Sequence, residues 1–203
     1  MAIVRPCSRR TVLKGALAAG ALSSGGILPR PLFAAPVFPL TPSCRKGLQE
    51  QATLPSASGP YFKPDSPERG DFIDAHSHGH LIALKGRVLS RTCQPVARAL
   101  LDLWHADQNG VYDESGFRYR GHIYSDEQGY YEFHTIEPAV YPGRTRHFHF
   151  RVQAPGRPIL TTQLFFPGEP RNDVDGLFRP ELLMSISDTP ALMSAQFDFI
   201  VDA

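Results

Sequence analysis

Two histidines one residue apart, His147 and His149, form the pattern in this chain that is most capable of chemistry. Residues two apart on a β-strand point to the same face of a sheet, so one strand can present both imidazoles to one metal ion. Phe148, Phe150 and Val152 would then point to the opposite face, as core residues do. The spacing therefore predicts a metal site carried on a β-strand.

Two tyrosines could complete such a site. Tyr141 precedes the histidine pair, and Tyr112 follows the turn-forming segment DQNG. Tyrosine binds a metal as a phenolate, and its ordinary pKa of about 10 makes it a poor ligand for most divalent ions. A highly charged hard cation such as Fe(III) depresses the pKa of its ligands and changes that balance. Two phenolates with two neutral imidazoles therefore favour Fe(III).

Three segments that carry these residues resemble the intradiol ring-cleavage dioxygenases, the family of the catechol and protocatechuate 3,4-dioxygenases. They read LDLWHADQNGVYD, GYYEFHTIEPAVYPGRTRHFHF and TTQLFFPGEP. Weaker similarity lies in GPYFKPDSPERGDF and LKGRVLSRTCQPVARALL, so the resemblance covers about residues 59–170. It is specific because two tyrosines, an HxH pair and a glutamine occur in the family's order.

The resemblance implies one non-haem Fe(III) per chain, held by Tyr112, Tyr141, His147 and His149. Tyr141 would be the ligand that substrate displaces, and it would then take up a substrate proton. The implied reaction is O2-dependent cleavage of a catecholic ring between its two hydroxyl-bearing carbons, which gives a muconate-type dicarboxylate. The implied partners are a small catechol and O2, and the sequence does not indicate which catechol is preferred.

Arg144 and Gln163 are the residues that the resemblance places beside the substrate. Arg144 would stabilise negative charge on the activated ring, and Gln163 would position the substrate or oxygen. Tyr141 and His147 are closer together than in the better-known soluble members, so Arg146 is an alternative to Arg144. The same shortened loop lies where specificity would be set.

Other residues allow further interpretations. The run DAHSHGHL places three histidines at alternate positions, which would suit zinc or copper, although Gly and Ser neighbours favour a loop. These histidines are His76, His78 and His80. Tyr61 either lines the pocket or packs with the N-terminal arm. We interpret Trp104 as a core residue, and His105 and His134 as structural residues near strand ends.

The elements that must position these residues are predicted to be β-strands. Apolar or alternating runs, separated by turn clusters, predict strands at 81–90, 96–105, 120–124, 129–136, 147–153, 160–166, 182–187 and 196–202. Many short strands with this spacing favour an all-β fold, a single β-sandwich of mostly antiparallel strands. Folds of this type host many functions, so the alternative to an enzyme is an exported ligand-binding module without catalysis.

The N-terminal sequence CSRRTVLKG, followed by GALAAGALSSGGIL, indicates a twin-arginine export signal with Arg9 and Arg10 as the pair. We therefore predict a signal peptide over 1–34, an irregular arm rich in Pro, Ser and Gly over 35–72, and a catalytic domain over 73–203. The apolar run is shorter than the roughly 18–20 residues of a spanning helix. We expect a periplasmic or extracellular protein with no stable membrane span.

Charge and cysteine content limit the remaining possibilities. Five of the 21 basic residues lie within 1–34, which holds no acidic residue, so 16 basic and 20 acidic residues follow. That balance gives no indication of nucleic-acid binding. Beyond the signal, Cys44 and Cys93 form either one disulfide, as an oxidising compartment favours, or two free thiols. Nothing in the sequence indicates the oligomeric state.

Overall fold

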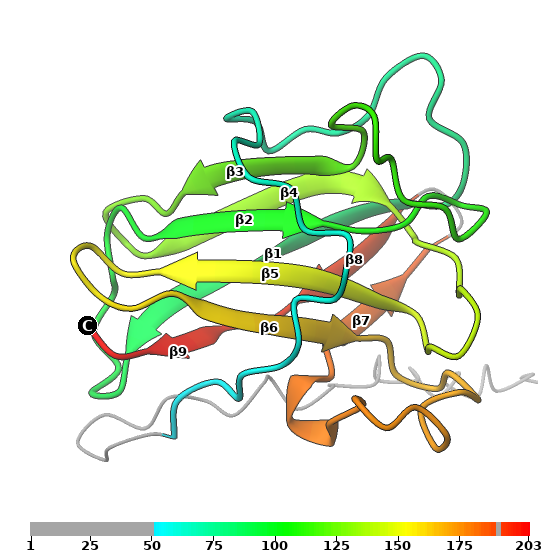
Figure 1. Ribbon diagram of the computed structural model, residues 1–203. Helices are drawn as coiled ribbons and strands as arrows, with labels where there is room; N and C mark the ends of the chain where they lie inside the picture. Colours follow the sequence, from blue (N-terminus) through cyan, green and yellow to red (C-terminus); the bar gives the residue numbers. More distant parts are fainter. Residues whose placement is uncertain (1–50, 190–191) are drawn as a thin grey trace, which may run out of the picture. The chain divides into compact units, whose positions relative to one another are not determined.

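The computed structural model describes residues 51–189 and 192–203, which form a β-sandwich (Figure 1). The strands are β1 (Leu81–Ser90), β2 (Leu100–Trp104), β3 (Arg120–Tyr124), β4 (Tyr130–Ile136), β5 (His147–Gln153), β6 (Leu160–Phe165), β7 (Ser185–Asp188), β8 (Met193–Gln196) and β9 (Phe199–Val201). Within the described residues, the only helical element is a 3-10 helix at Pro180–Leu182. The predicted all-β fold is confirmed.

The strands form two sheets. One has the strand order β3-β2-β5-β6 and is antiparallel throughout. The other has the order β4-β1-β8-β7, and β9 pairs with the end of β1. The pairings of β1 with β8 and with β9 are parallel, and the other five strand pairings are antiparallel. The sandwich is therefore mostly antiparallel, as expected.

The hydrophobic core lies between the two sheets. Phe148 and Phe150 of β5 are fully buried in it. The ring of Phe150 packs against Phe133 of β4, at 5.9 Å between centroids, and against Phe199 of β9, at 5.0 Å. The predicted alternation along β5 is therefore confirmed, and it leaves the intervening histidines on the outer face of the four-stranded sheet.

Three predicted strands differ from the observed bounds by more than one residue. The expected strand 96–105 begins only at Leu100, because Arg98 has a φ of +54°, a left-handed conformation that interrupts extended chain. The expected strand 182–187 is preceded by the 3-10 helix and begins at Ser185. The expected strand 196–202 contains β9 and only the last residue of β8, with a break between them, and β8 itself begins earlier, at Met193.

The break between β8 and β9 lies against Gly86 of β1. A Cβ atom at Gly86 would lie 1.8 Å from the carbonyl oxygen of Phe197, so only glycine permits this approach. The amide of Phe197 donates to the carbonyl of Lys85, and the carboxylate of Asp198 accepts from the amide of Arg87. The carboxylate of Asp198 thus takes the place of a backbone carbonyl as the acceptor for Arg87, and the regular pairing of β1 is interrupted between β8 and β9.

Residues 51–72 cross the outer face of the four-stranded sheet, as the cyan segment of Figure 1 shows. The amide of Ser56 donates to Thr161 of β6, and the amide of His122 of β3 donates to Pro67. This described part of the predicted arm contributes isolated bridges at Glu68 and Asp71 and no strand. The arm therefore covers the face to which the histidines of β5 point.

Several predictions concern residues 1–50, which lie outside the described residues. They include the signal peptide and Cys44. Cys93 is disulfide-bonded, and its pairing with Cys44 stays a prediction. Among the described residues, no helix is long and apolar enough to cross a membrane.

Candidate metal centre

One row of side chains crosses the outer face of the four-stranded sheet. Arg120, Trp104, His149 and Gln163 are Cα partners from β3, β2, β5 and β6 in turn. All four are buried although they point away from the core. The arm explains this burial, because it passes close to His149. A Cβ atom added at Gly59 of the arm would lie only 3.3 Å from Cε1 of His149.

His147 and His149 direct their Nε2 atoms at each other, 3.0 Å apart. Nδ1 of His147 donates to the carbonyl of Thr145 at 2.7 Å, which leaves a lone pair on its Nε2. Burial, with the nearby Arg144 cation, lowers the pKa of His147 to about 4. Burial and the neighbouring His147 lower the pKa of His149 well below its ordinary value. Two neutral imidazoles so placed can share one proton or bind one cation.

Tyr112 and Tyr141 lie beside these imidazoles. The ring centroid of Tyr112 is 6.1 Å from that of His149, and that of Tyr141 is 5.7 Å from that of His147. The Tyr112 hydroxyl is buried and has no hydrogen-bond partner among the described residues. Burial, with the nearby Tyr141, raises the pKa of Tyr112. A buried hydroxyl without a partner costs free energy, which a bound cation would offset.

These four side chains fit a hard, highly charged metal ion such as Fe(III). They offer two phenol oxygens, which bind such a cation as phenolates, and two imidazole nitrogens. Across residues 51–189 and 192–203, no three histidine, cysteine or acidic side chains converge as a metal site. The site therefore depends on its tyrosines. The structure brings together Tyr112, Tyr141, His147 and His149, and their binding of iron stays a prediction.

Arg144, rather than Arg146, reaches this centre. Nη1 of Arg144 donates to the hydroxyl of Tyr141 at 3.2 Å. Arg146 instead pairs with two acidic residues, Glu137 at 2.7 Å and Glu169 at 3.0 Å. The geometry therefore favours Arg144 for the role that the resemblance implies.

Gln163 lies between Arg144 and the arm. Its Oε1 accepts from Nη2 of Arg144 at 2.5 Å, and its Nε2 donates to the carbonyl of Ala57 at 2.6 Å. Both ends of the amide are thus held, and its side chain is fully buried. Gln163 is the Cα partner of His149 and fastens the arm beside the predicted ligands, and its role toward the substrate or oxygen stays a prediction.

Aromatic rings enclose the centre. Tyr61 of the arm stacks on Tyr112, with ring centroids 4.3 Å apart, and meets Tyr141 edge to face at 6.2 Å. Tyr61 therefore belongs to the arm and lines the site as well. Trp104 was predicted as core. That prediction is confirmed, and Trp104 belongs to a small core cluster with Ala106 and Tyr112 that is separate from the main core.

The three histidines of the 76–80 region do not form a metal cluster in the part of the chain that the structure describes. His76 and His78 are exposed. Nδ1 of His80 lies 3.9 Å from a carboxylate oxygen of Glu137, and its Nε2 lies 3.3 Å from the carbonyl oxygen of Thr189.

The two histidines interpreted as structural have local partners. His105 is buried, with Nδ1 2.7 Å from the carbonyl of Ala106 and Nε2 2.7 Å from the hydroxyl of Thr135. Nε2 of His134 lies 3.4 Å from a carboxylate oxygen of Glu132 on the same strand. These contacts agree with a structural role for both.

Sequence reasoning missed Arg120. Its guanidinium donates to the carbonyls of Tyr61 and Asp113, at 2.6 and 3.0 Å, and lies 5.9 Å from the ring centroid of Tyr112. The residue joins the arm, the loop after Tyr112 and the sheet. No motif marks it, because its position opposite Trp104 depends on strand register.

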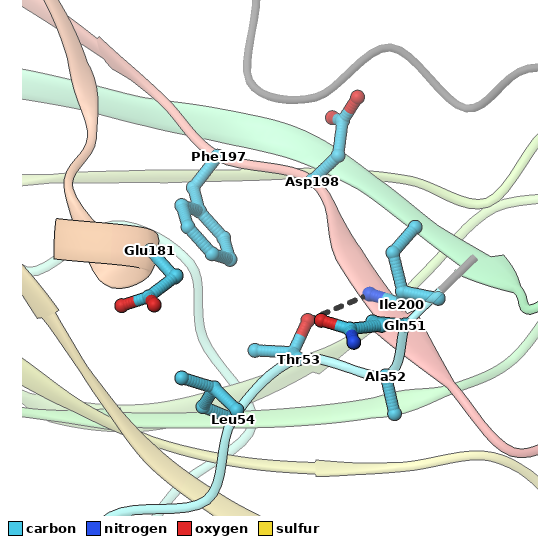
Figure 2. A pocket seen from close by; sticks show the side chains of 8 residues that line it. All are labelled: Gln51, Ala52, Thr53, Leu54, Glu181, Phe197, Asp198 and Ile200. Atoms are coloured by element: carbon cyan, nitrogen blue, oxygen red, sulfur yellow. Dashed lines mark hydrogen bonds between the residues drawn. The ribbon is translucent and has the colours of Figure 1, made fainter. Parts of the chain in front are cut away.

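A separate pocket lies beside β9 (Figure 2). Its lining includes Thr53, Leu54, Glu181, Phe197, Asp198 and Ile200. The hydroxyl of Thr53 accepts from the amide of Ile200 at 2.8 Å. The lining contains no residue of the predicted metal centre.

Comparison with known proteins decides the family. The sequence model of a protein family described as dioxygenase matches residues 57–202 of this chain. The chain belongs to the intradiol dioxygenase family. Hydroxyquinol 1,2-dioxygenase of Nocardioides simplex is 31% identical to it over 166 residues, which are 69% of this chain and 57% of that enzyme. The corresponding enzyme of Rhodococcus opacus is 30% identical over 146 residues, 60% of this chain and 49% of that enzyme.

Solved structures of intradiol dioxygenases share the fold. The dioxygenase domain of a dioxygenase carbohydrate-binding protein fusion from Streptomyces sp. SirexAA-E is 47% identical, with a TM-score of 0.74. The similarity covers 75% of this chain and 99% of that one. The 3-chlorocatechol 1,2-dioxygenase of Rhodococcus opacus 1CP is 28% identical, with a TM-score of 0.70, over 74% of this chain and 73% of that one. This intradiol dioxygenase chain spans about half the length of the hydroxyquinol 1,2-dioxygenases it matches.

Proposed function

We propose that this protein is a non-haem Fe(III) dioxygenase that cleaves a catecholic ring between its two hydroxyl-bearing carbons with O2, giving a muconate-type dicarboxylate. One observation carries the proposal: two tyrosines and two neutral histidines converge at one buried place beside the Arg144 cation. Relatives named as hydroxyquinol and chlorocatechol 1,2-dioxygenases support it.

The metal would be held by the phenol oxygens of Tyr112 and Tyr141 and by Nε2 of His147 and His149. Fe(III), when bound there, would supply a Lewis acid that binds catecholate oxygens and draws electron density from the ring. Burial keeps both imidazoles neutral, so the tyrosines supply the negative charge of the ligand set. The carbonyl of Thr145 fixes the tautomer of His147 that leaves Nε2 available.

Tyr141 is the tyrosine suited to move a proton. It is only partly buried, whereas Tyr112 is 6% exposed. The hydroxyl oxygen of Tyr141 lies 3.2 Å from Nη1 of Arg144, so a phenolate there has a fixed cationic donor beside it. We assign to this oxygen the uptake of a proton from the incoming catechol, a general base role.

Arg144 is placed to stabilise negative charge on the ring. Its side chain is 13% exposed, and in such water-poor surroundings a positioned donor stabilises developing charge more strongly than in water. Loss of a comparable donor in other enzymes costs about 10²–10³ in rate. Tyr61 on the arm and Gln163 on β6 flank the site, where they would limit the access of water to the reacting ring.

Oxygen uptake by the iron-loaded protein tests this function. The panel should contain hydroxyquinol, catechol and chlorocatechols, which the relatives' names suggest, together with protocatechuate and larger plant-derived phenols. We expect uptake with at least one catechol and none with a resorcinol of the same size, because its hydroxyls are not adjacent. Failure of fully iron-loaded protein to consume oxygen with any of them would favour the binding module without catalysis.

A further inference from the structure

The guanidinium of Arg144 is held on three sides. Its Nη2 donates to Oε1 of Gln163 at 2.5 Å, and its Nη1 donates to the hydroxyl of Tyr141 at 3.2 Å. Its Nε donates to Oδ2 of Asp175 at 2.9 Å. Arginine has many rotamers, and a planar guanidinium bound at Nε can present its two remaining nitrogens in only one plane. The contact with Asp175 therefore determines where the other two nitrogens point.

Asp175 is itself firmly placed. It lies in the loop that follows β6, and its side chain is 2% exposed. Its Oδ2 also accepts from the amide of Thr145 at 2.8 Å, and its Oδ1 accepts from the amide of Leu177 at 2.9 Å. Burial alone would raise the pKa of Asp175, but these amides and Arg144 outweigh it and hold the pKa below its ordinary value.

The same carboxylate supports the chain that leads into β5. The amide of Thr145 binds Asp175, and the carbonyl of Thr145 accepts from Nδ1 of His147 at 2.7 Å. The hydroxyl of Thr145 donates to Oδ1 of Asn172, which lies in the same loop as Asp175. One loop thus holds both the arginine and the backbone that orients His147.

We propose that Asp175 is a positioning residue for ring cleavage, one that acts by fixing the guanidinium of Arg144 with its Nη1 toward Tyr141. This inference rests on the proposed function and adds to it a residue that does not itself touch the ring. In Asp175→Asn the negative charge is lost and an NH2 group replaces one acceptor oxygen, so the side chain can no longer accept from Arg144, Thr145 and Leu177 together. The guanidinium is then held less firmly and can rotate away from Tyr141. Misplacement of a catalytic group by about 1 Å can cost roughly 10²-fold in rate.

The test compares Asp175→Asn with Asp173→Asn, an exposed aspartate two residues away that undergoes the same change of charge. We expect Asp175→Asn to lower kcat by about 10- to 100-fold, with a smaller change in KM. Its Fe(III) charge-transfer band should also shift, because the cationic donor beside Tyr141 is no longer fixed. Asp173→Asn should match the wild type in both measurements.

A double-mutant cycle separates positioning from general stability. In an Arg144→Lys background, Asp175→Asn should cause little further loss, because the guanidinium on which it acts is gone. Full additivity of the two losses, or wild-type kcat and an unshifted band in Asp175→Asn, would overturn the inference. Asp175→Glu keeps the charge and should recover part of kcat, and it carries the same cycle if the asparagine variant does not fold. Wild-type protein that shows neither a band nor oxygen uptake would instead contradict the proposed function, and the inference with it.

Discussion

The indole of Trp104 lies parallel to the imidazole of His149, with ring centroids 4.9 Å apart and planes 4° apart. The two residues are Cα partners on neighbouring strands, so sheet register brings the rings together. Trp104 also meets Phe62 of the arm edge to face, with ring centroids 5.1 Å apart. The indole thus links the arm to a predicted metal ligand and limits the rotation of His149.

This stacking makes Trp104 important for stability. Trp104→Ala should lower the free energy of unfolding by about 3–5 kcal/mol, as for other large buried aromatic residues. Trp104→Phe should cost less, because it keeps a ring against His149, and Nε1 of Trp104 has no hydrogen-bond partner among the described residues. Denaturant unfolding of both variants measures the difference. If Trp104→Ala and Trp104→Phe lowered the free energy of unfolding equally, an aromatic ring against His149 would contribute nothing to stability.

Arg120 should be a second determinant of stability. Arg120→Gln removes the donors of two carbonyl groups, those of Tyr61 and Asp113. Each acceptor left buried without its donor costs about 1–3 kcal/mol. Thermal or denaturant unfolding should show this loss, whereas Arg157→Gln, a change at an exposed arginine, should be close to neutral. An Arg120→Gln protein as stable as the Arg157→Gln control would contradict the structural role.

Asp113, in the loop after Tyr112, should stabilise the folded protein less in acid. Burial alone would raise the pKa of Asp113, but amides that include those of Ser115, Gly116 and Arg118 donate to its carboxylate and lower the pKa to about 2. The ordinary value is 3.8. Between these two pKa values, Asp113 is ionised in the folded protein and protonated in the unfolded chain. Its contribution to the free energy of unfolding is therefore complete above pH 3.8 and disappears as the pH falls toward 2.

Asp113→Asn isolates that contribution. The wild type should be more stable than the variant above about pH 4, and the difference should shrink between pH 4 and 2. Denaturant unfolding at pH 6, 4, 3 and 2 measures it. A difference that stays constant across this range would show that the carboxylate charge is not responsible.

The tyrosines of the metal centre have a spectroscopic signature. Phenolate-to-Fe(III) charge transfer should colour the loaded protein red-brown, and Tyr112→Phe or Tyr141→Phe removes one anionic ligand. The band should therefore shift or vanish in each variant. Tyr130→Phe, at a tyrosine whose hydroxyl donates to Glu132, is the matched control and should leave the band in place. If the two site variants keep both the spectrum and the iron content, the site lies elsewhere.

How much of this could be predicted from sequence depends on the range of the interactions. The alternation of His147 and His149 with core phenylalanines follows from the two-residue period of a strand and is local. The row from Arg120 to Gln163 depends on register among four strands, which a single sequence does not contain. The contact of Arg144 with Asp175 joins loops 31 residues apart, so no local pattern marks it.

The split of the last predicted strand has a similar cause. Residues 196–202 are apolar enough for one strand, but the close approach of Phe197 to Gly86 is a property of the packed sheet. The cluster to which Trp104 belongs could not be predicted for the same reason. A tryptophan within an apolar run is usually core, and the arm that covers this one lies about 40 residues earlier in the chain.

We propose export by the twin-arginine route from Arg9 and Arg10, which lie outside the described residues. That route carries folded proteins, which suits a site loaded with its metal before export. Changing both arginines to lysine should retain the protein inside the cell, as immunoblots of periplasmic and cytoplasmic fractions would show. Normal export of the double variant would reject this route.

The identity of the ring-cleavage product tests the central claim most directly. Iron-loaded protein should be supplied with a catechol that it consumes, under oxygen-18-labelled O2, and the product identified by mass and absorbance. The account predicts a muconate-type dicarboxylate that carries both labelled oxygen atoms. A yellow semialdehyde, which results from cleavage beside rather than between the hydroxyl-bearing carbons, would contradict it.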